Sequence, residues 1–208
     1  MKKQLFSLFA CMALLVACNN NAGTKQEAEN KEEATEKKES SDASSLSGSI
    51  LNTADDAQKR IEELKKLPPI SNETLKSYFP EEVMGMKRSS FNVTSAMGYA
   101  VGTATYRKDD TTNYKVEIYD CAGEAGSAFY GMSWLSRINM EREDDNGYEK
   151  TVSYNGSNAL ESYSKSNHEH RMSFLTGERF WVSMEGNEGL DNLKTFAERL
   201  GLDKLKAK

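Results

Sequence analysis

Alternation of apolar and polar residues, interrupted by short turns, constrains the fold of this chain more than any other feature. In the run "YKVEIYDC", Val116, Ile118 and Asp120 fall on one side of an extended strand. The run "AMGYAVGTATYRK" alternates in the same way, and Asn-Gly at 155–156 is a hairpin signal. Several such runs joined by tight turns predict an antiparallel sheet.

Helical spacing of apolar residues predicts four helices around these strands. The first begins near Ser49 and ends before Pro68, and the second follows with Ser71 as its N-cap. The stripes of the other two are Ala125, Ala128, Phe129, Met132 and Leu135, and then Leu190, Leu193, Phe196, Ala197 and Leu200.

The order of these elements predicts the α+β class, with a mostly antiparallel, curved sheet of about seven strands and helices packed on one face. In that order the chain resembles the Mog1/PsbP-like and TATA-binding-protein-like folds, an analogy that carries no function. A faint echo between "FNVTSA" (91–96) and "YNGSNA" (154–159) suggests a degenerate duplication, or arises by chance.

The N-terminus carries the features of a secretory signal. "MKK" is a positive segment and "QLFSLFACMALLVA" an apolar one, too short for a spanning helix. Leu15-Val16-Ala17-Cys18 resembles the lipobox of bacterial lipoproteins. The resemblance implies cleavage before Cys18, a diacylglyceryl group on its thiol and acylation of the new N-terminus. An ordinary signal peptide cut after Ala17, or an uncleaved anchor, is the alternative.

Three regions follow: a signal peptide at 1–17, a lipidated cysteine and disordered tether at 18–48, and one α+β domain at 49–208. Residues 19–47 contain no aromatic residue and a single large aliphatic, Leu46, so this segment cannot offset its ordering entropy by burial. By resemblance to the sorting rule of enterobacteria, Asn19 does not retain the protein in the inner membrane. We therefore expect an outer-membrane lipoprotein, facing either the periplasm or the cell surface.

Charge and cysteine usage narrow the possible partners. The net charge is −5, and loss of Lys2 and Lys3 with the signal takes it to −7. An acidic chain argues against nucleic acid, whose binding needs a clustered basic face. Of three cysteines, Cys11 leaves with the signal and Cys18 becomes a thioether. Cys121 is then the only thiol, which leaves no intramolecular disulfide.

The stretch "DCAGEAGS" places Cys121 between a strand and a helix, where phosphate loops and activated nucleophiles occur. A phosphate loop needs Gly-Lys-Ser/Thr after four intervening residues, and here two residues separate Gly123 from Gly126 and no lysine follows. A thiol near a helix N-terminus can be reactive, but Asp120 and Glu124 oppose thiolate formation. A packed structural thiol is the favoured interpretation, and a reactive one stays open.

Two further groups of residues are candidates for binding. His168 and His170 have a metal-ligand spacing, but zinc needs three or four ligands, so we predict no metal and no cofactor. Aromatic residues with polar tips could line a ligand site, and strand propensity explains the same pattern. The candidates for such a site are Tyr99, Tyr119, Tyr163 and Trp181.

These features lead to three hypotheses on function. The first is a membrane-anchored, non-catalytic binding domain for an unknown protein or small molecule. The others are a thiol-dependent envelope enzyme using Cys121, and a carrier of an amphiphilic ligand. From Asn72 onward, strings such as "LKSYFPEEVMGMKRSSF" and "YDCAGEAGS" resemble small lipoproteins of Bacteroidota. That resemblance implies no activity and no catalytic residues.

Overall fold

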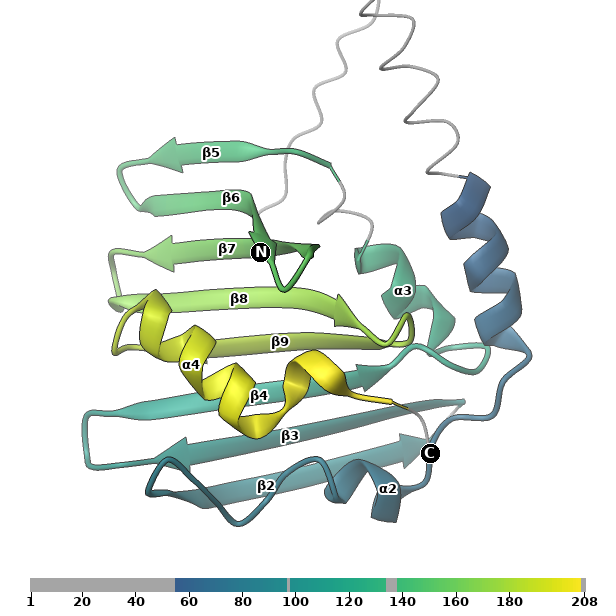
Figure 1. Cartoon of the computed structure of the whole chain (residues 1–208), viewed down its shortest axis with the longest axis horizontal. Helices are drawn as coiled ribbons and strands as arrows, with labels where there is room; N and C mark the ends of the chain where they lie inside the picture. Colours follow the sequence, from purple (N-terminus) through teal and green to yellow (C-terminus); the bar gives the residue numbers. More distant parts are fainter. Residues whose placement is uncertain (1–54, 97, 134–137, 207–208) are drawn as a thin grey trace, which may run out of the picture. The chain divides into compact units, whose positions relative to one another are not determined.

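Nine strands within the described part of the chain form one antiparallel sheet (Figure 1). The computed structural model describes residues 55–96, 98–133 and 138–206, which belong to one compact unit. The strand order is β1-β2-β3-β4-β9-β8-β7-β6-β5, so that β4 and β9 meet in the middle. The strands are β1 (Glu82–Val83), β2 (Met86–Ala96), β3 (Tyr99–Arg107), β4 (Asn113–Asp120), β5 (Glu141–Asp144), β6 (Gly147–Tyr154), β7 (Ser157–Ser164), β8 (Glu169–Thr176) and β9 (Phe180–Gly186).

The α+β class and the antiparallel sheet agree with the sequence prediction, but the prediction of about seven strands is wrong. β1 has two residues and pairs with the start of β2 across a tight turn at Met84–Gly85, where both residues have positive φ. β5 is exposed at all four of its residues and pairs with β6. Neither strand alternates over enough residues to give a period-two signal.

Along the chain, helical segments come before β1, between β4 and β5, and after β9. They cover residues 55–65, α2 (Asn72–Lys76), α3 (Ser127–Ser133), α4 (Leu190–Leu200) and the 3₁₀ turn η2 (Leu202–Lys204). The predicted cap of α2 is confirmed, because the Ser71 hydroxyl accepts a hydrogen bond from the backbone N–H of Thr74 at 3.2 Å. The predicted start near Ser49 lies outside the described residues.

The predicted stripe of α3 is only partly right. Phe129 is half-buried as expected, but Ala128 is exposed, and Tyr130, which the stripe omits, is buried. The helix begins at Ser127, so Ala125 precedes it in the turn. A short helix that starts in a packed turn buries the side chains nearest the sheet, whatever the longer period suggests. The placement of Leu135 and of the Met132 side chain is outside the described residues.

The two sides of the sheet differ in what covers them. We call the side that carries Val116 and Met184 the α4 face, and the side that carries Glu117 and Ser183 the open face. Helix α4 crosses the first of these in front of β8, β9 and β4 (Figure 1). Its Phe196 ring stacks on Tyr114, with centroids 4.6 Å apart. The main core lies here, between α4, α2 and the sheet.

A second, smaller cluster lies on the open face, where the helix over 55–65 and α3 cover one end of the sheet. It contains Ala57, Leu64, Cys121, Tyr130 and Trp181. Helices therefore pack on both faces, and the expectation of helices on one face is wrong. An amphipathic stripe identifies the buried side of a helix but not the face of the sheet that it meets.

The internal echo falls on unlike structures. Residues 91–96 lie within β2, whereas residues 154–159 run from the end of β6 through a turn into β7. In addition, α3 packs on the open face and α4 on the opposite one. A two-fold axis perpendicular to the sheet would place both helices on the same face, so these segments do not mark equivalent positions of a repeat.

Candidate ligand groove on the open sheet face

A groove crosses the central strands of the open face where two serines lie between bulkier side chains. Ser183 of β9 pairs with Ser173 of β8, and the two hydroxyls are 3.1 Å apart. Alternate residues of a strand share a face, so larger side chains line the groove one pleat to either side. The cavity has a volume of about 330 Å³, and besides the serines its lining includes Glu117, Tyr119, Phe129, Glu149, Arg171 and Trp181.

One wall of the groove is aromatic. Tyr119 and Trp181 are directly paired across β4 and β9. The ring of Phe129, from α3, lies against Tyr119 with centroids 4.8 Å apart. Trp181 is only 5% exposed, so it fixes this wall by packing beneath the helices. The wall exists because α3 and the sheet bury their aromatic groups against each other, which is the geometry such rings prefer.

The opposite wall is charged, with Glu117 and Arg171 in the lining of the groove and Lys115 and Glu185 beside them. Lys115 lies 2.9 Å from a Glu117 oxygen and 3.6 Å from Glu185. Arg171 lies 2.6 Å from the other Glu185 oxygen. Hydrogen bonding to these carboxylates raises the pKa of both Lys115 and Arg171. Each cation of this row is thus paired with a carboxylate, and such charged hydrogen-bonding groups can bind the polar edge of a ligand.

Tyr119 connects the two walls. Its hydroxyl donates to a Glu117 oxygen at 2.9 Å. Burial, and then the Glu117 carboxylate, raise the pKa of Tyr119 to about 12. The phenol is therefore neutral at physiological pH and presents its ring, with its proton committed to Glu117. An aromatic wall facing polar side chains is the usual composition of a small-molecule site.

Of the four aromatic residues predicted to form a site, the structure brings two together in the groove, Tyr119 and Trp181. Tyr99 lies beside it, with its ring 6.1 Å from Phe129. Tyr163 lies on the α4 face, so its inclusion in one site with the others is wrong. Its strand position pairs with His170, and the register, which the local sequence does not reveal, decides the face.

Sequence reasoning missed Phe129 and the two serines. Phe129 belonged to a stripe interpreted as core, and the serines carry no chemistry that marks a site. Their signal is the strand pattern, because Ser183 has the same parity as Trp181 in β9. Small residues between large ones on the same face of a sheet leave a hollow, but only once the register of β8 and β9 is known.

Cys121 lies beneath this wall and is not part of the groove lining. It is 0% exposed, in the cluster under α3 and the helix over 55–65. Burial raises the pKa of the thiol to about 12. The preference for a packed thiol agrees with this placement. A thiol at this depth is almost entirely protonated at neutral pH and is a poor nucleophile.

The glycines of "DCAGEAGS" allow neighbouring backbone segments to pack closely against this turn. Gly123 has φ of +86°, and a Cβ there would lie 2.4 Å from the carbonyl oxygen of Gly98. The Gly123 N–H donates to the Leu64 carbonyl at 3.0 Å, which ties the turn to the end of the helix over 55–65. The turn is therefore a junction between the sheet and two helices.

The two histidines lie at the other end of the sheet. His168 is in the β7–β8 turn, 3.2 Å from the Tyr163 hydroxyl, and the His170 ring lies 4.5 Å from the Tyr163 ring between centroids. Burial lowers the pKa of His170. Within residues 55–96, 98–133 and 138–206, no group of three His, Cys, Asp or Glu side chains is placed to hold a metal ion.

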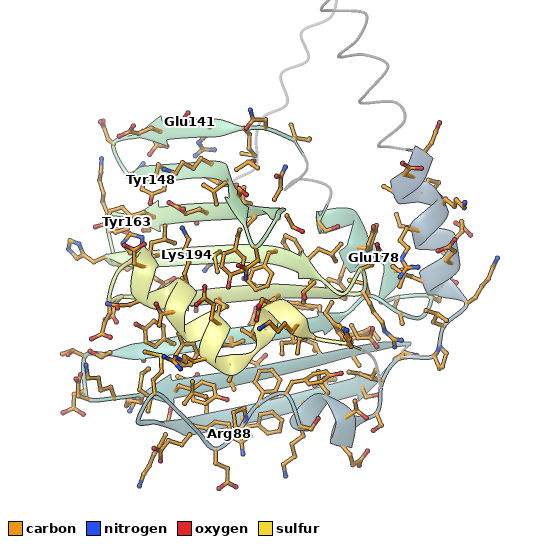
Figure 2. The ribbon with its side chains drawn as sticks, in the orientation of Figure 1. Arg88, Glu141, Tyr148, Tyr163, Glu178 and Lys194 are labelled. Carbon is orange, nitrogen blue, oxygen red and sulfur yellow. The ribbon has the colours of Figure 1, made fainter. Side chains whose placement is uncertain are left out.

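Near these histidines, Glu161 is a buried carboxylate on the α4 face. Glu161 is 3% exposed and accepts a hydrogen bond from the Tyr148 hydroxyl at 2.7 Å. Lys150 and Lys194 each lie 3.8 Å from a Glu161 oxygen. Tyr148, Tyr163 and Lys194 lie toward the same end of the strands (Figure 2). Because Lys194 belongs to α4, the Glu161 carboxylate links this helix to strands β6 and β7.

Comparisons with known proteins add little to this geometry. The sequence matches no protein-family model and no curated protein. One solved structure that matches is described as a GTP binding regulator from Thermotoga maritima. It is 14% identical, covers 67% of this chain and 94% of its own, and gives a TM-score of 0.31. At that TM-score the likeness carries no argument. No helix in the described part of the chain is long and apolar enough to cross a membrane.

Proposed function

We propose that the protein is a lipid-anchored cell-envelope lipoprotein whose α+β domain binds a small polar ligand without catalysis. The groove between Tyr119, Trp181 and Arg171 is the observation that carries this proposal. One wall offers flat apolar rings, and the other offers a fixed guanidinium and carboxylates. A ligand with a flat ring or apolar face and polar edges matches both walls.

The anchor rests on the sequence around Cys18, which lies outside the described residues. The lipobox-like Leu15-Val16-Ala17-Cys18 and the charged tether at 18–48 support a domain held at a distance from a membrane. Three acyl chains, at about 0.8 kcal/mol per buried CH₂, would give a hold far above that of a single chain. Asn19 supports the outer membrane as the location, with the domain on either side of it.

The alternatives are less well supported. An enzyme that uses Cys121 needs an accessible thiolate, and this thiol is buried with a raised pKa. An amphiphile carrier needs a large apolar cavity. The α4 face is filled by packed side chains, and the groove has charged residues on one wall. The fold analogy to Mog1/PsbP-like or TATA-binding-protein-like proteins remains part of the proposal on element order alone, and it supplies no function.

Metabolic labelling tests the anchor. The full chain is expressed in a bacterial host with an alkyne-tagged palmitate, alongside Cys18→Ala and Cys121→Ala. We expect label on the wild type and on Cys121→Ala and none on Cys18→Ala. Label that persists in Cys18→Ala would refute the lipid site. The Cys121→Ala control separates loss of the acceptor from loss of any cysteine.

Filling the groove tests the binding site. Ser183→Leu places a bulky side chain on the groove floor, and Ser153→Leu makes the same change at an exposed position of the open face outside the lining. A thermal-shift screen of polar metabolites on the full chain should give ligands that stabilise the wild type and Ser153→Leu but not Ser183→Leu. Ligands that stabilise all three proteins equally would place binding elsewhere.

A further inference from the structure

A second cavity adjoins the groove on the open face and extends it toward β5. Its volume is about 410 Å³, and it shares Glu149, Ser162 and Arg171 with the lining of the groove. These three residues are directly paired across β6, β7 and β8. The two cavities therefore meet over a serine that has a carboxylate on one side and a guanidinium on the other.

The Glu149 carboxylate has no cation of its own. Among the described residues it forms neither an ion pair nor a side-chain hydrogen bond, because the nearby cations have other partners. Arg142, paired with it across β5 and β6, lies 3.3 Å from Asp144, and Lys150 lies 3.8 Å from Glu161 on the α4 face. Glu149 is half-buried, so part of it is accessible from both cavities. A carboxylate only accepts hydrogen bonds, so this one suits a donor on a ligand.

Arg171 keeps donors for a ligand although it is paired. Both of its ion pairs use Nη2, which lies 2.6 Å from Glu185 and 3.6 Å from Glu169. A guanidinium has five N–H donors, and in the part of the chain that the structure describes Nε and Nη1 have no partner. The side chain is 54% exposed. Arg171 can therefore donate to a carboxylate in the space above Ser162.

Glu149 and Arg171 together suit a ligand that carries both charges. Glu117, the other acid in the groove lining, already has both oxygens occupied, by Lys115 at 2.9 Å and the Tyr119 hydroxyl at 2.9 Å. Neighbouring strands are about 4.8 Å apart, so the backbones at Glu149 and Arg171 are separated by about 10 Å. In an α-amino acid two carbon atoms separate the ammonium nitrogen from the carboxylate oxygens. With a hydrogen bond of about 2.8 Å at each end, such a ligand spans the gap between the two side chains.

The rest of the groove suits an aromatic side chain on that ligand. Ser173 and Ser183 form the floor. Tyr119 and Phe129 are half-buried, so each leaves part of its ring open to the groove. Aromatic groups pack favourably against such rings. The volume of about 330 Å³ is at the lower end of the range for small-molecule pockets, which suits a ligand with a single ring.

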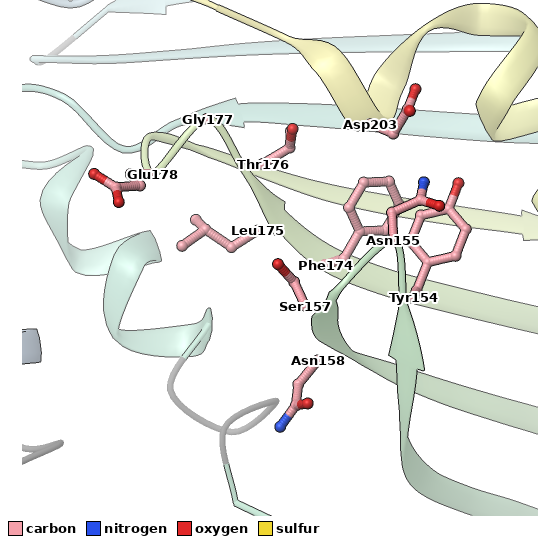
Figure 3. A pocket seen from close by; sticks show the side chains of 10 residues that line it. All are labelled: Tyr154, Asn155, Ser157, Asn158, Phe174, Leu175, Thr176, Gly177, Glu178 and Asp203. Carbon is pink, nitrogen blue, oxygen red and sulfur yellow. The ribbon is translucent and has the colours of Figure 1, made fainter.

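A larger cavity at one end of the sheet offers less to a ligand of this kind (Figure 3). Its volume is about 420 Å³. Its two aromatic residues, Tyr154 and Phe174, are 7% and 3% exposed, so they present almost no ring surface. Its two acids, Glu178 and Asp203, each have a cation 3.9 Å away. The groove is therefore the better match, with accessible rings and an unpaired carboxylate.

We propose that the groove binds a free α-amino acid with an aromatic side chain. Glu149 accepts hydrogen bonds from the ammonium group, and Arg171 donates to the carboxylate. The ring of the ligand lies over Ser183, against Tyr119 and Phe129. This inference rests on the proposed function of the groove and names the class of its ligand.

Titration calorimetry on the full chain in mild detergent compares four probes. L-phenylalanine carries all three groups, 3-phenylpropanoate lacks the ammonium, 2-phenylethylamine lacks the carboxylate, and L-alanine lacks the ring. We expect saturable binding of L-phenylalanine. Each of the other three should bind at least about tenfold more weakly, because each loses one set of contacts.

Variants assign the two charged contacts. Glu149→Gln should weaken L-phenylalanine about tenfold without weakening 3-phenylpropanoate, which has no ammonium to lose. Arg171→Gln should weaken L-phenylalanine without weakening 2-phenylethylamine. The matched control is Glu143→Gln, which removes the same charge from an exposed residue paired with Tyr148 on the α4 face. L-phenylalanine should bind Glu143→Gln within twofold of the wild type. Because Glu149 has no partner to lose, Glu149→Gln should also leave the melting temperature of the unliganded protein unchanged.

Three results would overturn the inference. They are the absence of saturable L-phenylalanine binding, equal affinities for L-phenylalanine and 3-phenylpropanoate, and equal losses in Glu143→Gln and Glu149→Gln. The metabolite screen with Ser183→Leu separates this failure from failure of the proposed function. Other ligands that depend on Ser183 would leave the groove as a binding site and remove only the amino acid. A screen in which no ligand depends on Ser183 would remove both.

Discussion

The carboxylate of Asp120 accepts two hydrogen bonds from the guanidinium of Arg179, at 2.6 Å from Nε and 2.8 Å from Nη2. Asp120 is fully buried at the end of β4, and the Arg179 side chain is only 12% exposed. Asp120 also accepts from the Ile70 backbone N–H at 2.8 Å, and Arg179 donates to the Pro68 carbonyl at 2.9 Å. One ion pair thus joins the two central strands to the segment that follows the helix over 55–65.

Breaking this pair should destabilise the domain strongly. Asp120→Ala leaves a buried guanidinium uncompensated and the Ile70 N–H without its partner, so we expect a loss of about 3–5 kcal/mol in the free energy of unfolding. Urea unfolding followed by circular dichroism measures it. Asp120→Asn keeps a hydrogen-bond acceptor, so its free energy of unfolding should lie between those of the wild type and Asp120→Ala.

A surface pair provides the control for that measurement. Arg142 and Asp144 lie 3.3 Å apart with most of the Arg142 side chain exposed. Exposed pairs contribute little because solvent screens them. Arg142→Ala should leave the urea midpoint unchanged within error. A loss for Asp120→Ala no larger than for Arg142→Ala would show that the buried pair contributes nothing net.

Cys121 should be inert in the folded protein. Its pKa is raised to about 12 by burial, so the thiolate population is minute at pH 8 and the sulfur is enclosed. With Cys11→Ala and Cys18→Ala as background, so that Cys121 is the only thiol, Ellman's reagent should react with less than one thiol in the native chain until urea unfolds it. The apparent rate should then follow the unfolding equilibrium. Rapid reaction in native buffer would revive the thiol-enzyme hypothesis.

The sequence could predict which residues of β4 face the core, but not what they meet there. Alternation placed Val116, Ile118 and Asp120 on one side, and all three are buried. Arg179 lies 59 residues further along the chain, and only the pairing of β4 with β9 brings it to Asp120. Pairing between strands distant in sequence depends on packing of the whole sheet, which local patterns do not contain.

The same limit explains the partial success at the groove. Tyr119 and Trp181 were named from residue type, and register makes them neighbours. Tyr163 is also aromatic, but its position in β7 places it on the α4 face of the sheet. The serines of the floor are defined as a site only by the larger side chains around them, so no local signal could single them out.

The glycine of the β4–α3 turn should tolerate no side chain. Gly123→Ala would place a Cβ 2.4 Å from a backbone oxygen in a residue with φ of +86°, so strain and displacement add. We expect a loss of about 2–4 kcal/mol. Gly156 is the matched control, because its φ is +76° but nothing lies within 4 Å of the added Cβ. Gly156→Ala should cost only the backbone strain, about 1 kcal/mol. Equal losses would contradict the close approach at Gly123.

Stability should fall in mild acid through His170. Burial lowers its pKa, so below about pH 6.5 the unfolded state takes up a proton that the folded state resists. The unfolded state then binds more protons, and the free energy of unfolding falls as pH falls from 7 to 5. His170→Gln should remove that part of the pH dependence, whereas His168→Gln, in the exposed turn, should retain it. Urea midpoints at pH 5, 6 and 7 decide between these outcomes.

Alkaline titration should separate burial from charge at Tyr148. Its pKa is raised to about 12, first by burial and then by the hydrogen bond and charge of Glu161. The folded state keeps a proton that the unfolded tyrosine loses near pH 10, so stability falls as pH rises above 10. Glu161→Gln removes the charge and should lower the Tyr148 pKa while leaving it above 10, because burial remains the larger cause. The measurement is ultraviolet difference titration of Glu161→Gln against the parent, with Tyr148→Phe to assign the signal. A Tyr148 pKa that stays at about 12 in Glu161→Gln would mean that burial alone sets it.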